Sequence, residues 1–504
     1  MVYAVTDGSK VKYNLITGVA GQITAMLLGI LVPKLVLTVY GSEVNGLLSS
    51  VTNIYAYIAI VEAGVAAASC QALYKPIAEK NTGDINAVLS ATNRYYHRTG
   101  MVYLSLVLLF SLIYPALINT DIPYTTVCLI ILFNGIGNVI NYFFHGKYLI
   151  LLKADGKHYV RTGLEMFTNI LKHLAKIVLI GAGFDLLFVQ FVTMCVSFVQ
   201  MIYITAYIRK HYSWIDLSVT PNSKAISQSK NVFVHEVNYL ITSNVDTVLL
   251  TVFTTLKTVS VYSLYHLLFS MIDRVLRIVR DSFEFKIAKI FNGDKKRFAD
   301  TFSVFEVCYI TLSFALVSIA GFFVLPFISL YTQGITDIQY VDRWISLAFV
   351  LIGLLSAARY PFDAMIHIAG HFRQTQKSAV IESVINLGLS AVLVRPFGIV
   401  GVLLGTAFSS IYRTSYLVVY VHRNILKSNG RNTCVYLGVN ILIFLLLQTA
   451  NSFIRVPLDS YARIFTFCVP YALGVIVLYF SVVFAANPKI LKHIKGLLAN
   501  GRSR

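Results

Sequence analysis

Long apolar runs separated by short polar segments recur along the whole chain. Many of them hold about 20 residues, which is the length that an α-helix needs to cross a hydrocarbon core of about 30 Å. Backbone N–H and C=O groups find no water in that core, so only helices or a closed barrel can span it. The runs do not alternate with a period of two, as barrel strands do, and they therefore predict helices.

Fourteen such segments are expected, and they make the fold class an all-α polytopic membrane protein. The composition agrees, because 57% of the residues are hydrophobic and 13% are charged, about half the charge of a typical soluble domain. The approximate bounds of the spans are 13–33, 45–72, 99–119, 124–147, 162–183, 186–208, 231–254, 259–280, 302–328, 344–368, 376–394, 399–421, 434–451 and 464–486.

A short internal repeat groups these spans into lobes. Leu37–Tyr40 (LTVY) closes the first span, and Leu250–Phe253 (LTVF) closes the seventh. Repeats that lie six helices apart start on the same side of the membrane, which implies two parallel lobes. We therefore divide the chain into an N-lobe (1–230), a C-lobe (231–430) and a segment with the last two spans and a tail (431–504).

Positive charges divide unequally between the two sides of this bundle. Of the 42 Lys and Arg residues, 32 fall in segments on the side of the N-terminus and six in loops on the other side. Because cytoplasmic loops carry the excess of Lys and Arg, both termini are predicted to be cytoplasmic. The net charge of +19 is explained by basic loops that fix the orientation of the chain in the membrane and contact anionic lipids. We therefore expect no nucleic-acid binding.

The sequence carries no motif for catalysis or for ATP hydrolysis. GxxxxGK[ST] is absent, and the six cysteines form no CxxC pair and no Cys/His metal spacing. No paired carboxylates share a helix face, and no Ser/His/Asp arrangement recurs at useful spacing. We therefore predict that the chain is not an enzyme and holds no metal or cofactor. A proton or sodium gradient is left as a candidate driving force.

The fifth span carries a stripe of polar side chains at intramembrane depth. Glu165, Asn169, Lys172 and Lys176 follow one another at steps of four, three and four, which places them on one helix face. A charge at mid-span costs about 2.5–3.5 kcal/mol on insertion scales, and two lysines one turn apart repel each other. We interpret Lys172 and Lys176 as a cationic wall for an anionic substrate. Pairing with carboxylates of neighbouring helices is the alternative.

The fourth span carries a second stripe, formed by Asn134, Asn138, Asn141 and His145. Amide groups both donate and accept hydrogen bonds, which suits the hydroxyls of sugars. Hydrogen bonding between packed helices is the alternative.

Two arginines lie inside later spans. In the tenth, Arg359 and Asp363 stand one turn apart and can pair within the helix, but Arg359 is also suited to a bidentate grip on phosphate. In the twelfth, Arg413 has no acidic residue within a turn. It therefore needs a partner from elsewhere in the protein, or a ligand.

Intramembrane acids and one histidine are candidates for ion coupling or for structural charge pairs. They are Glu62, His235, Asp246 and Asp363. Together, the four buried bases and the asparagines predict a large anionic, hydroxyl-rich cargo, such as a sugar linked to a lipid pyrophosphate. A drug cation would require an anionic cavity instead.

Two stretches resemble the multidrug/oligosaccharidyl-lipid/polysaccharide exporter superfamily, and in particular its bacterial Wzx-type polysaccharide flippases. The first is Leu37–Asn81, which contains Val39–Leu47 (VYGSEVNGL) and then Glu62-Ala63-Gly64. These motifs are similar to the family's YG-x-E-x-x-G-L turn and E-x-G. The second and more specific stretch runs from Arg359 to Thr406 and includes Glu382 and Asn386. Asp246 before an apolar run also resembles the start of the family's second lobe.

The resemblance implies a MATE-like fold with alternating access through a cavity between two lobes. It implies a flippase for undecaprenyl-pyrophosphate-linked oligosaccharide units in the bacterial cytoplasmic membrane, serving surface polysaccharide biosynthesis. Its partners would be the lipid-linked substrate and pathway proteins such as a polysaccharide polymerase. A lipid II flippase for peptidoglycan remains the main alternative, ahead of a cation-coupled drug exporter or a membrane glycosyltransferase.

Overall fold

The computed structural model describes residues 8–59, 65–222, 244–291, 295–454, 460–488 and 490–491. Within these ranges the chain is helical and contains no strand. The chain folds into two compact units, residues 1–260 and 261–504, which are described separately. The division lies about 30 residues beyond the lobe boundary expected at 230/231, because the short helix Asn244–Phe253 packs within the first unit.

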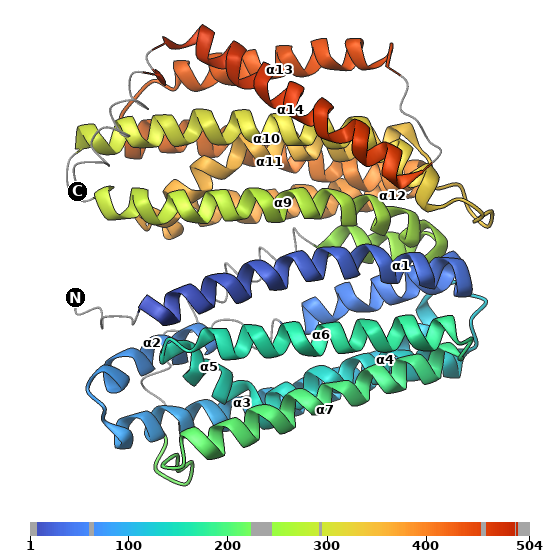
Figure 1. Cartoon of the computed structure of the whole chain (residues 1–504), viewed down its shortest axis with the longest axis vertical. Coiled ribbons are helices and arrows are strands. Elements are labelled where there is room, and N and C mark those ends of the chain that lie inside the picture. The colour runs from blue at the N-terminus through green and yellow to red at the C-terminus, as the bar shows by residue number, and fades with distance from the viewer. Residues whose placement is uncertain are drawn as a thin grey trace. The chain divides into compact units, whose positions relative to one another are not determined.

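The first unit is built from seven labelled α-helices and one π-helical turn, together with the short helix Asn244–Phe253 (Figure 1). Their bounds are α1 Gly8–Ile58, α2 Val65–Ala78, α3 Thr82–Leu117, α4 Tyr124–Ile140, η2 Asn141–His145, α5 Gly146–Ala154, α6 His158–Gly181 and α7 Leu186–His211. The boundary between the two units, after residue 260, falls near the start of α9, which runs from Leu256 to Phe291. The remaining elements are α10 Lys295–Tyr331, α11 Arg343–Ala369, α12 Phe372–Val421, η4 His422–Leu426, α13 Arg431–Asn451 and α14 Tyr461–Ala486.

The expected spans coincide with these helices wherever the chain is described. Two helices each hold two expected spans, and a glycine with a positive φ angle divides each of them. Gly41 (φ 85°) divides α1 and Gly398 (φ 54°) divides α12. A side chain at these positions would force the backbone into a strained conformation, so glycine permits the sharp turn between spans.

Nine helices within the described ranges are long and apolar enough to cross a membrane. The helix α6 is also long enough, with 24 residues, but it is more highly charged because it carries Arg161, Glu165, Lys172 and Lys176. The cationic stripe expected from the sequence therefore lies on a helix whose charge sets it apart from the apolar spans around it.

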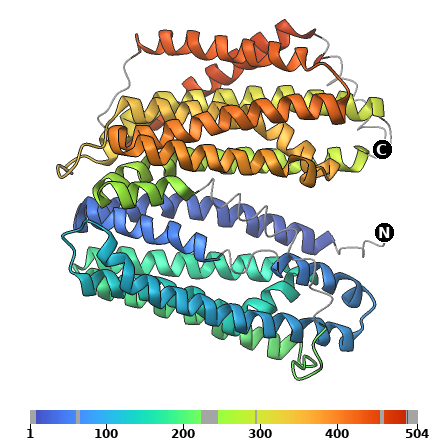
Figure 2. The same ribbon diagram turned by 180° about the vertical axis from the view of Figure 1, so that it is seen from behind.

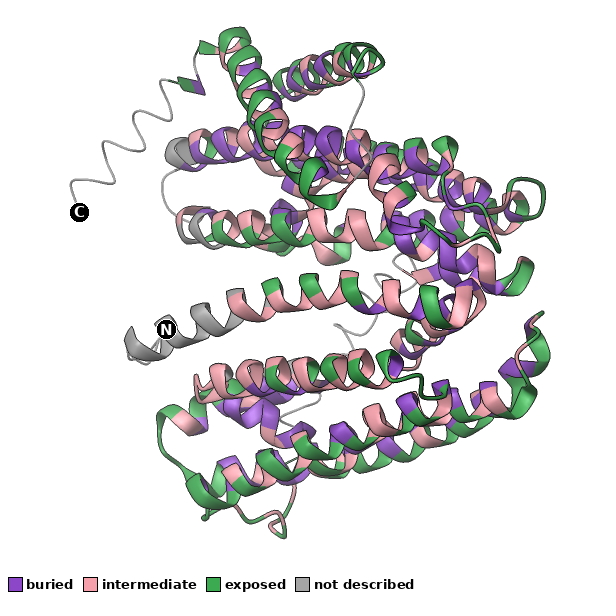
Figure 3. Ribbon diagram, turned by 45° about the vertical axis from the view of Figure 1, so that its right-hand side comes forward, coloured by how far each residue is buried: buried purple, intermediate pink, exposed green. Residues whose placement is uncertain are grey.

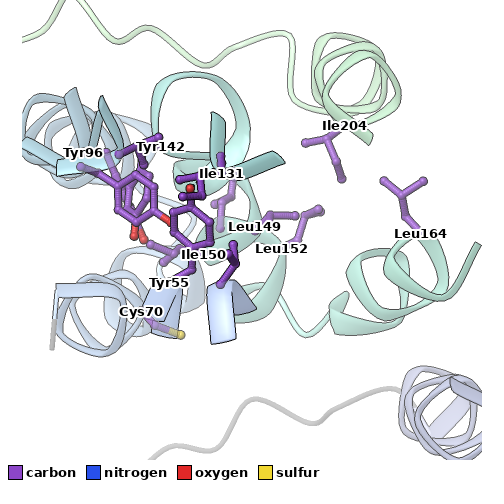
Figure 4. Packing of buried hydrophobic residues seen from close by; sticks show 14 of the residues in the cluster. Tyr55, Cys70, Tyr96, Ile131, Tyr142, Leu149, Ile150, Leu152, Leu164 and Ile204 are labelled. Atoms are coloured by element: carbon purple, nitrogen blue, oxygen red, sulfur yellow. Dashed lines mark hydrogen bonds between the residues drawn. The ribbon is translucent and has the colours of Figure 1, made fainter. Parts of the chain in front are cut away.

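In the first unit, neighbouring helices pack side by side in the order α1, α6, α7, α4 and α3 (Figures 1 and 2). Side chains from α1 to α7 fill the core, and Figure 4 shows part of this cluster around Tyr55, Tyr142 and Leu152. The Tyr55 hydroxyl donates a hydrogen bond to the carbonyl oxygen of Ile131 at 2.5 Å. A buried tyrosine thus keeps its polar end satisfied inside an apolar cluster.

Helix starts follow local sequence signals in both units. Asn81, Asp185 and Asp342 are the N-caps of α3, α7 and α11, and each side chain accepts a hydrogen bond from a backbone N–H of the first turn. Such caps satisfy donors that the helix itself leaves unpaired.

In the second unit, α10 packs against α11, α13 and α14, and α11 packs against α12. Its own core includes buried side chains of α10, α11, α13 and α14. The outer faces of α13 and α14 are largely exposed (Figure 3), and they present large apolar side chains such as Leu446 and Val477. An apolar outer face over a packed core suits contact with lipid rather than water.

A buried polar seam joins the second half of α1 to the segment Asn244–Ser260 within the first unit. The hydroxyl groups of Ser50 and Thr251 are 2.8 Å apart, and Tyr114 donates to Ser50 at 2.7 Å. Asn45 Nδ2 donates to Ser260 Oγ at 2.8 Å. Because all five side chains are buried, the seam depends on close approach of the backbones.

Gly46 sets that approach, and we predict that Gly46→Ala destabilises the protein. A Cβ at position 46 would lie 1.7 Å from the carbonyl oxygen of Leu256, and backbone cannot move aside as a flexible side chain can. Overpacking of this kind costs about 1–3 kcal/mol or more, so the apparent melting temperature in detergent should fall by several degrees. Gly388→Ala is the control, since a Cβ there meets nothing within 4 Å. Equal melting of the two variants would contradict the prediction.

Candidate functional site

A polar cavity of about 260 Å³ lies inside the first unit, between the α4–η2–α5 segment, α6 and α7. Ligand pockets are usually lined mainly by apolar side chains, but here most of the lining side chains carry amide, hydroxyl or charged groups. The polar and charged lining residues are Asn134, Asn138, Asn141, His145, Arg161, Glu165, Lys172, Gln190, Thr193, Ser197 and Gln200.

The structure brings the stripes of spans four and five together at this cavity. Asn134, Asn138 and Asn141 all line it, and so does Lys172. The amides also bond within the protein, since Asn134 Nδ2 donates to the Ile130 carbonyl at 2.8 Å and Asn138 Nδ2 to the Tyr103 hydroxyl at 3.0 Å. Asn138 therefore forms one hydrogen bond between packed helices, as the alternative interpretation expects, although the residue also lines the cavity.

Two buried polar atoms at the cavity have no hydrogen-bond partner among the described residues. They are Oδ1 of Asn141 and Nδ1 of His145, at the two ends of the π-helical turn η2. Buried polar groups are nearly always paired, so unpaired ones call for a partner such as water or a ligand. A π-turn inside a longer helix is also common at functional sites.

The charges of the cavity do not cancel. Arg161 Nε and Glu165 Oε1 are 2.7 Å apart and neutralise each other on α6. No carboxylate in the described part of the chain lies within 4.0 Å of Lys172 or Lys176. Lys172 lines the cavity, whereas Lys176 lies one turn further along α6 and is not part of the lining. Among the described residues, the cavity thus carries one positive charge without a paired carboxylate.

The contribution of α7 was missed by reasoning from the sequence. Gln190, Thr193, Ser197 and Gln200 line the cavity and follow one another at steps of three, four and three, which is one helix face. Gln190 and Ser197 are buried. The sequence shows these residues as a polar stripe in an apolar span. The stripe carries no charge, and the prediction of site residues depended mainly on intramembrane charges.

In the second unit, Arg359 and Arg413 meet at Glu382. Arg359 Nη1 donates to Glu382 Oε1 at 2.7 Å, and its Nε lies 3.0 Å from Asp363 Oδ2. Arg413 Nε lies 3.5 Å from Glu382 Oε2. The intrahelical pair of Arg359 with Asp363 is confirmed. Arg413 has no acid within a turn, as expected, and its partner comes from a position 31 residues earlier in the same long helix, across the Gly398 turn.

Further polar contacts surround this network. Arg413 donates to the carbonyl oxygen of Thr375 at 3.2 Å and to the Ser378 hydroxyl. Two arginines and two carboxylates therefore form a nearly neutral, hydrogen-bonded group between α11 and the two halves of α12. Nothing in it demands an external anion.

The structure describes only one of the three other residues expected to couple ions or to form structural charge pairs. Asp246 is buried in the helix Asn244–Phe253, where it interacts electrostatically with Tyr57 of α1. Glu62 and His235 lie outside the described residues. The part of the chain that the structure describes holds no cluster of three or more His, Cys, Asp or Glu side chains suited to a metal ion, and the expectation of no metal stays a prediction.

Comparison with known proteins gives a fold and no closer relationship. No family model matches the chain, and no curated protein matches it. The solved structure of the lipid II flippase MurJ, in an inward closed conformation, matches with a TM-score of 0.68 over 94% of this chain and 99% of that one, at 13% identity.

Multidrug resistance transporters of the MATE family, in the MOP superfamily, match as well. An inward-facing structure gives a TM-score of 0.59 at 14% identity, covering 80% of this chain and 95% of that one. An outward-facing structure gives 0.54 at 11% identity, covering 81% and 96%. The chain has the fold of these transporters. At such identities the likeness establishes the fold, and the function must be inferred from the site itself.

For the second unit, we predict that Glu382→Gln destabilises the protein far more than Asp363→Asn. Removing one partner of a buried ion pair costs about 3–5 kcal/mol, and Glu382, whose side chain is 11% exposed, serves two arginines. Asp363 is 27% exposed, and its loss leaves Arg359 bound to Glu382. Thermal unfolding of both purified variants in detergent tests this. A larger decrease in melting temperature for Asp363→Asn than for Glu382→Gln would contradict this prediction.

Proposed function

We propose that the chain is a flippase that moves undecaprenyl-pyrophosphate-linked oligosaccharide units across the bacterial cytoplasmic membrane by alternating access. The observation that carries the proposal is the Lys172 amino group, which has no carboxylate within 4.0 Å in the described ranges and lines a cavity whose other walls are rich in amides and hydroxyls. Cations bind phosphate oxygens, and amides exchange hydrogen bonds with sugar hydroxyls. Lipid-linked sugars combine both groups in one head.

The size of the cavity limits what it holds. Ligand pockets commonly measure about 300–1,000 Å³, and this one, of about 260 Å³, lies just below that range. It suits one sugar residue or one phosphate group, so we assign it as a subsite for part of the head group. Lys176, one turn further along α6, extends the positive charge beyond the cavity wall.

The arginines of the second unit contribute less to this proposal. Arg359 and Arg413 already share Glu382, and Arg359 also holds Asp363. A ligand phosphate would have to compete with these carboxylates for the same N–H donors. We therefore rank Lys172 and Lys176 first as cargo contacts, with Arg359 and Arg413 as positioning residues of the helix bundle.

A lipid II flippase is the second candidate, and one observation favours it. The MurJ structure matches 94% of this chain, against 80% and 81% for the two MATE structures. The cargo head of a lipid II flippase combines the same pyrophosphate and sugar chemistry. A drug exporter fits less well, because the cavity's acid, Glu165, is already paired with Arg161.

The remaining expectations follow from this assignment. Both termini would be cytoplasmic, as the distribution of Lys and Arg indicates, and no enzymatic step is required of the chain. The structural neighbours described above are named as a flippase and as transporters. Working partners would be the enzymes that assemble the lipid-linked unit and a polymerase that consumes it.

We predict that the double variant Lys172→Ala, Lys176→Ala loses transport while inserting and folding normally. Each hydrogen bond to a charged group contributes about 1.5–3 kcal/mol, so the flipping rate at subsaturating substrate should fall about tenfold or more. The measurement uses proteoliposomes that hold a fluorescent undecaprenyl-pyrophosphate disaccharide, with chemical quenching of the label that reaches the outer leaflet. Lys75→Ala is the control, because that side chain is 83% exposed on α2. A wild-type rate in the double variant would refute the cavity assignment.

Expression of the chain in two bacterial strains separates the two cargo assignments. One strain lacks a surface-polysaccharide flippase, and the other is depleted of its lipid II flippase. Restoration of surface polysaccharide without rescue of growth in the depleted strain supports the first proposal. Rescue of the depleted strain alone supports the lipid II assignment instead.

A further inference from the structure

A buried carboxylate in the second unit lies outside the group around Glu382. Glu306, on α10, is 4% exposed. No Lys or Arg of the described ranges lies within 4.0 Å of it. Its Oε1 accepts a hydrogen bond from the Thr433 hydroxyl, in the first turn of α13. An ionised carboxylate without a positive partner is costly in an apolar bundle, so this position calls for an explanation.

The hydrogen bonds continue from Thr433 to an exposed loop. His422 Nε2 lies 2.9 Å from Thr433 Oγ1, and His422 Nδ1 lies 2.7 Å from Ser428 Oγ. His422 is 8% exposed, whereas Ser428 is exposed. Four side chains therefore form one continuous hydrogen-bonded row from the loop before α13 to the buried carboxylate.

The chemistry of each group fixes the direction of these bonds. A threonine hydroxyl has one proton, and here it donates to Glu306. The hydroxyl oxygen can then only accept from the imidazole, so Nε2 of His422 carries a proton. On the other side of the ring, the Ser428 hydroxyl can donate to a bare Nδ1 or accept from a protonated one. The row can therefore take up a proton at its exposed end without losing a bond.

We propose that Glu306 is a proton-binding site, loaded from the aqueous surface at Ser428 through His422 and Thr433. A proton from water binds His422 Nδ1, the Nε2 proton passes to Thr433 Oγ1, and the former hydroxyl proton of Thr433 passes to Glu306 Oε1. Before the transfer Glu306 is anionic and His422 neutral. Afterwards both are neutral, with the imidazole proton on Nδ1. The net change is one proton moved from water to the carboxylate.

Few other ionisable groups in the described structure face this row. On α13, Tyr436 interacts electrostatically with Glu306 and accepts a hydrogen bond from Asn487. On α11, Phe362 packs on the imidazole with ring centroids 5.6 Å apart. The basic residues around the loop, Arg423, Lys427 and Arg431, are all exposed. The state of Glu306 is therefore governed by the row itself and by Tyr436.

The row joins α10, η4 and α13, so its proton content affects how α13 is held. With Glu306 ionised, Thr433 must donate to it. With Glu306 protonated, the same bond reverses, and the buried charge disappears. A role in driving transport rests on the proposed function, whereas the binding of the proton does not.

Infrared difference spectroscopy during a pH titration tests the proton site directly. The full-length protein is studied in vesicles of phosphatidylethanolamine and phosphatidylglycerol without substrate, between about pH 5 and pH 8, where histidine titrates. We expect a protonated-carboxyl band that rises as the pH falls, disappears in Glu306→Gln and persists in Glu79→Gln, an exposed surface control. Glutamine still accepts from Thr433, so Glu306→Gln should fold normally, which thermal unfolding verifies. Identical spectra of wild type and Glu306→Gln would overturn the proposal.

Two further measurements separate a proton relay from a structural hydrogen bond. Thr433→Val should retain the carboxyl band but slow its exchange with deuterated solvent about tenfold or more, and unchanged exchange would remove the relay. In the flipping assay, an imposed pH gradient should change the wild-type rate and leave the Glu306→Gln rate unchanged, and equal gradient dependence would exclude a coupling role. Absence of flipping by the wild-type protein would refute the proposed function, and the infrared result would still decide the proton site.

Discussion

Charge that lies inside a membrane needs a partner in the protein, in water or in a ligand, since the hydrocarbon offers none. The two units of this chain meet that requirement in different ways. In the second unit, Arg359 and Arg413 are held by Glu382 and Asp363, so each positive charge has a fixed counter-charge. In the first unit, Arg161 is paired, whereas Lys172 has no carboxylate within 4.0 Å among the described residues. This difference is the reason for placing the proposed anionic ligand in the first unit.

The fourth span is locally distorted beside the cavity. A regular α-helix from Tyr124 to Ala154 would pair its backbone groups uniformly, but residues 141–145 form a π-helical turn instead. An extra residue in a turn rotates the side chains that follow, which changes what the helix presents to its neighbours. Asn141 and His145, at the two ends of the turn, both line the cavity, and each has one polar atom without a partner among the described residues. The distortion therefore places polar atoms where a ligand or water can use them.

Sequence reasoning succeeded where a single helix contains the whole signal. The apolar runs located the described spans, and Gly41 and Gly398 lie where two spans adjoin. The predicted stripe of asparagines lines the cavity. It failed where partners come from different helices or from the two halves of a bent helix. Glu382 reaches Arg413 only because α12 bends between them, and Thr433 meets Glu306 across 127 positions. The periodicity of polar residues shows which face of a helix they share, but it does not show which neighbouring helix that face contacts. The uncharged stripe on α7 was overlooked because amides and hydroxyls cost less to bury than charges.

Binding a cargo and driving its movement are separate physical tasks. A lysine that holds a phosphate equally well in every conformation of a transporter shifts no equilibrium, because a ligand changes populations only through differential affinity. The proposed cargo site in the first unit, taken alone, would therefore account for selection of an anionic, hydroxyl-rich head and not for directional transport. A second ligand that binds elsewhere and alters helix packing would supply what is missing. A proton at the proposed Glu306 site is suited to that task, because it would remove a buried charge and reverse the hydrogen bond between α13 and α10.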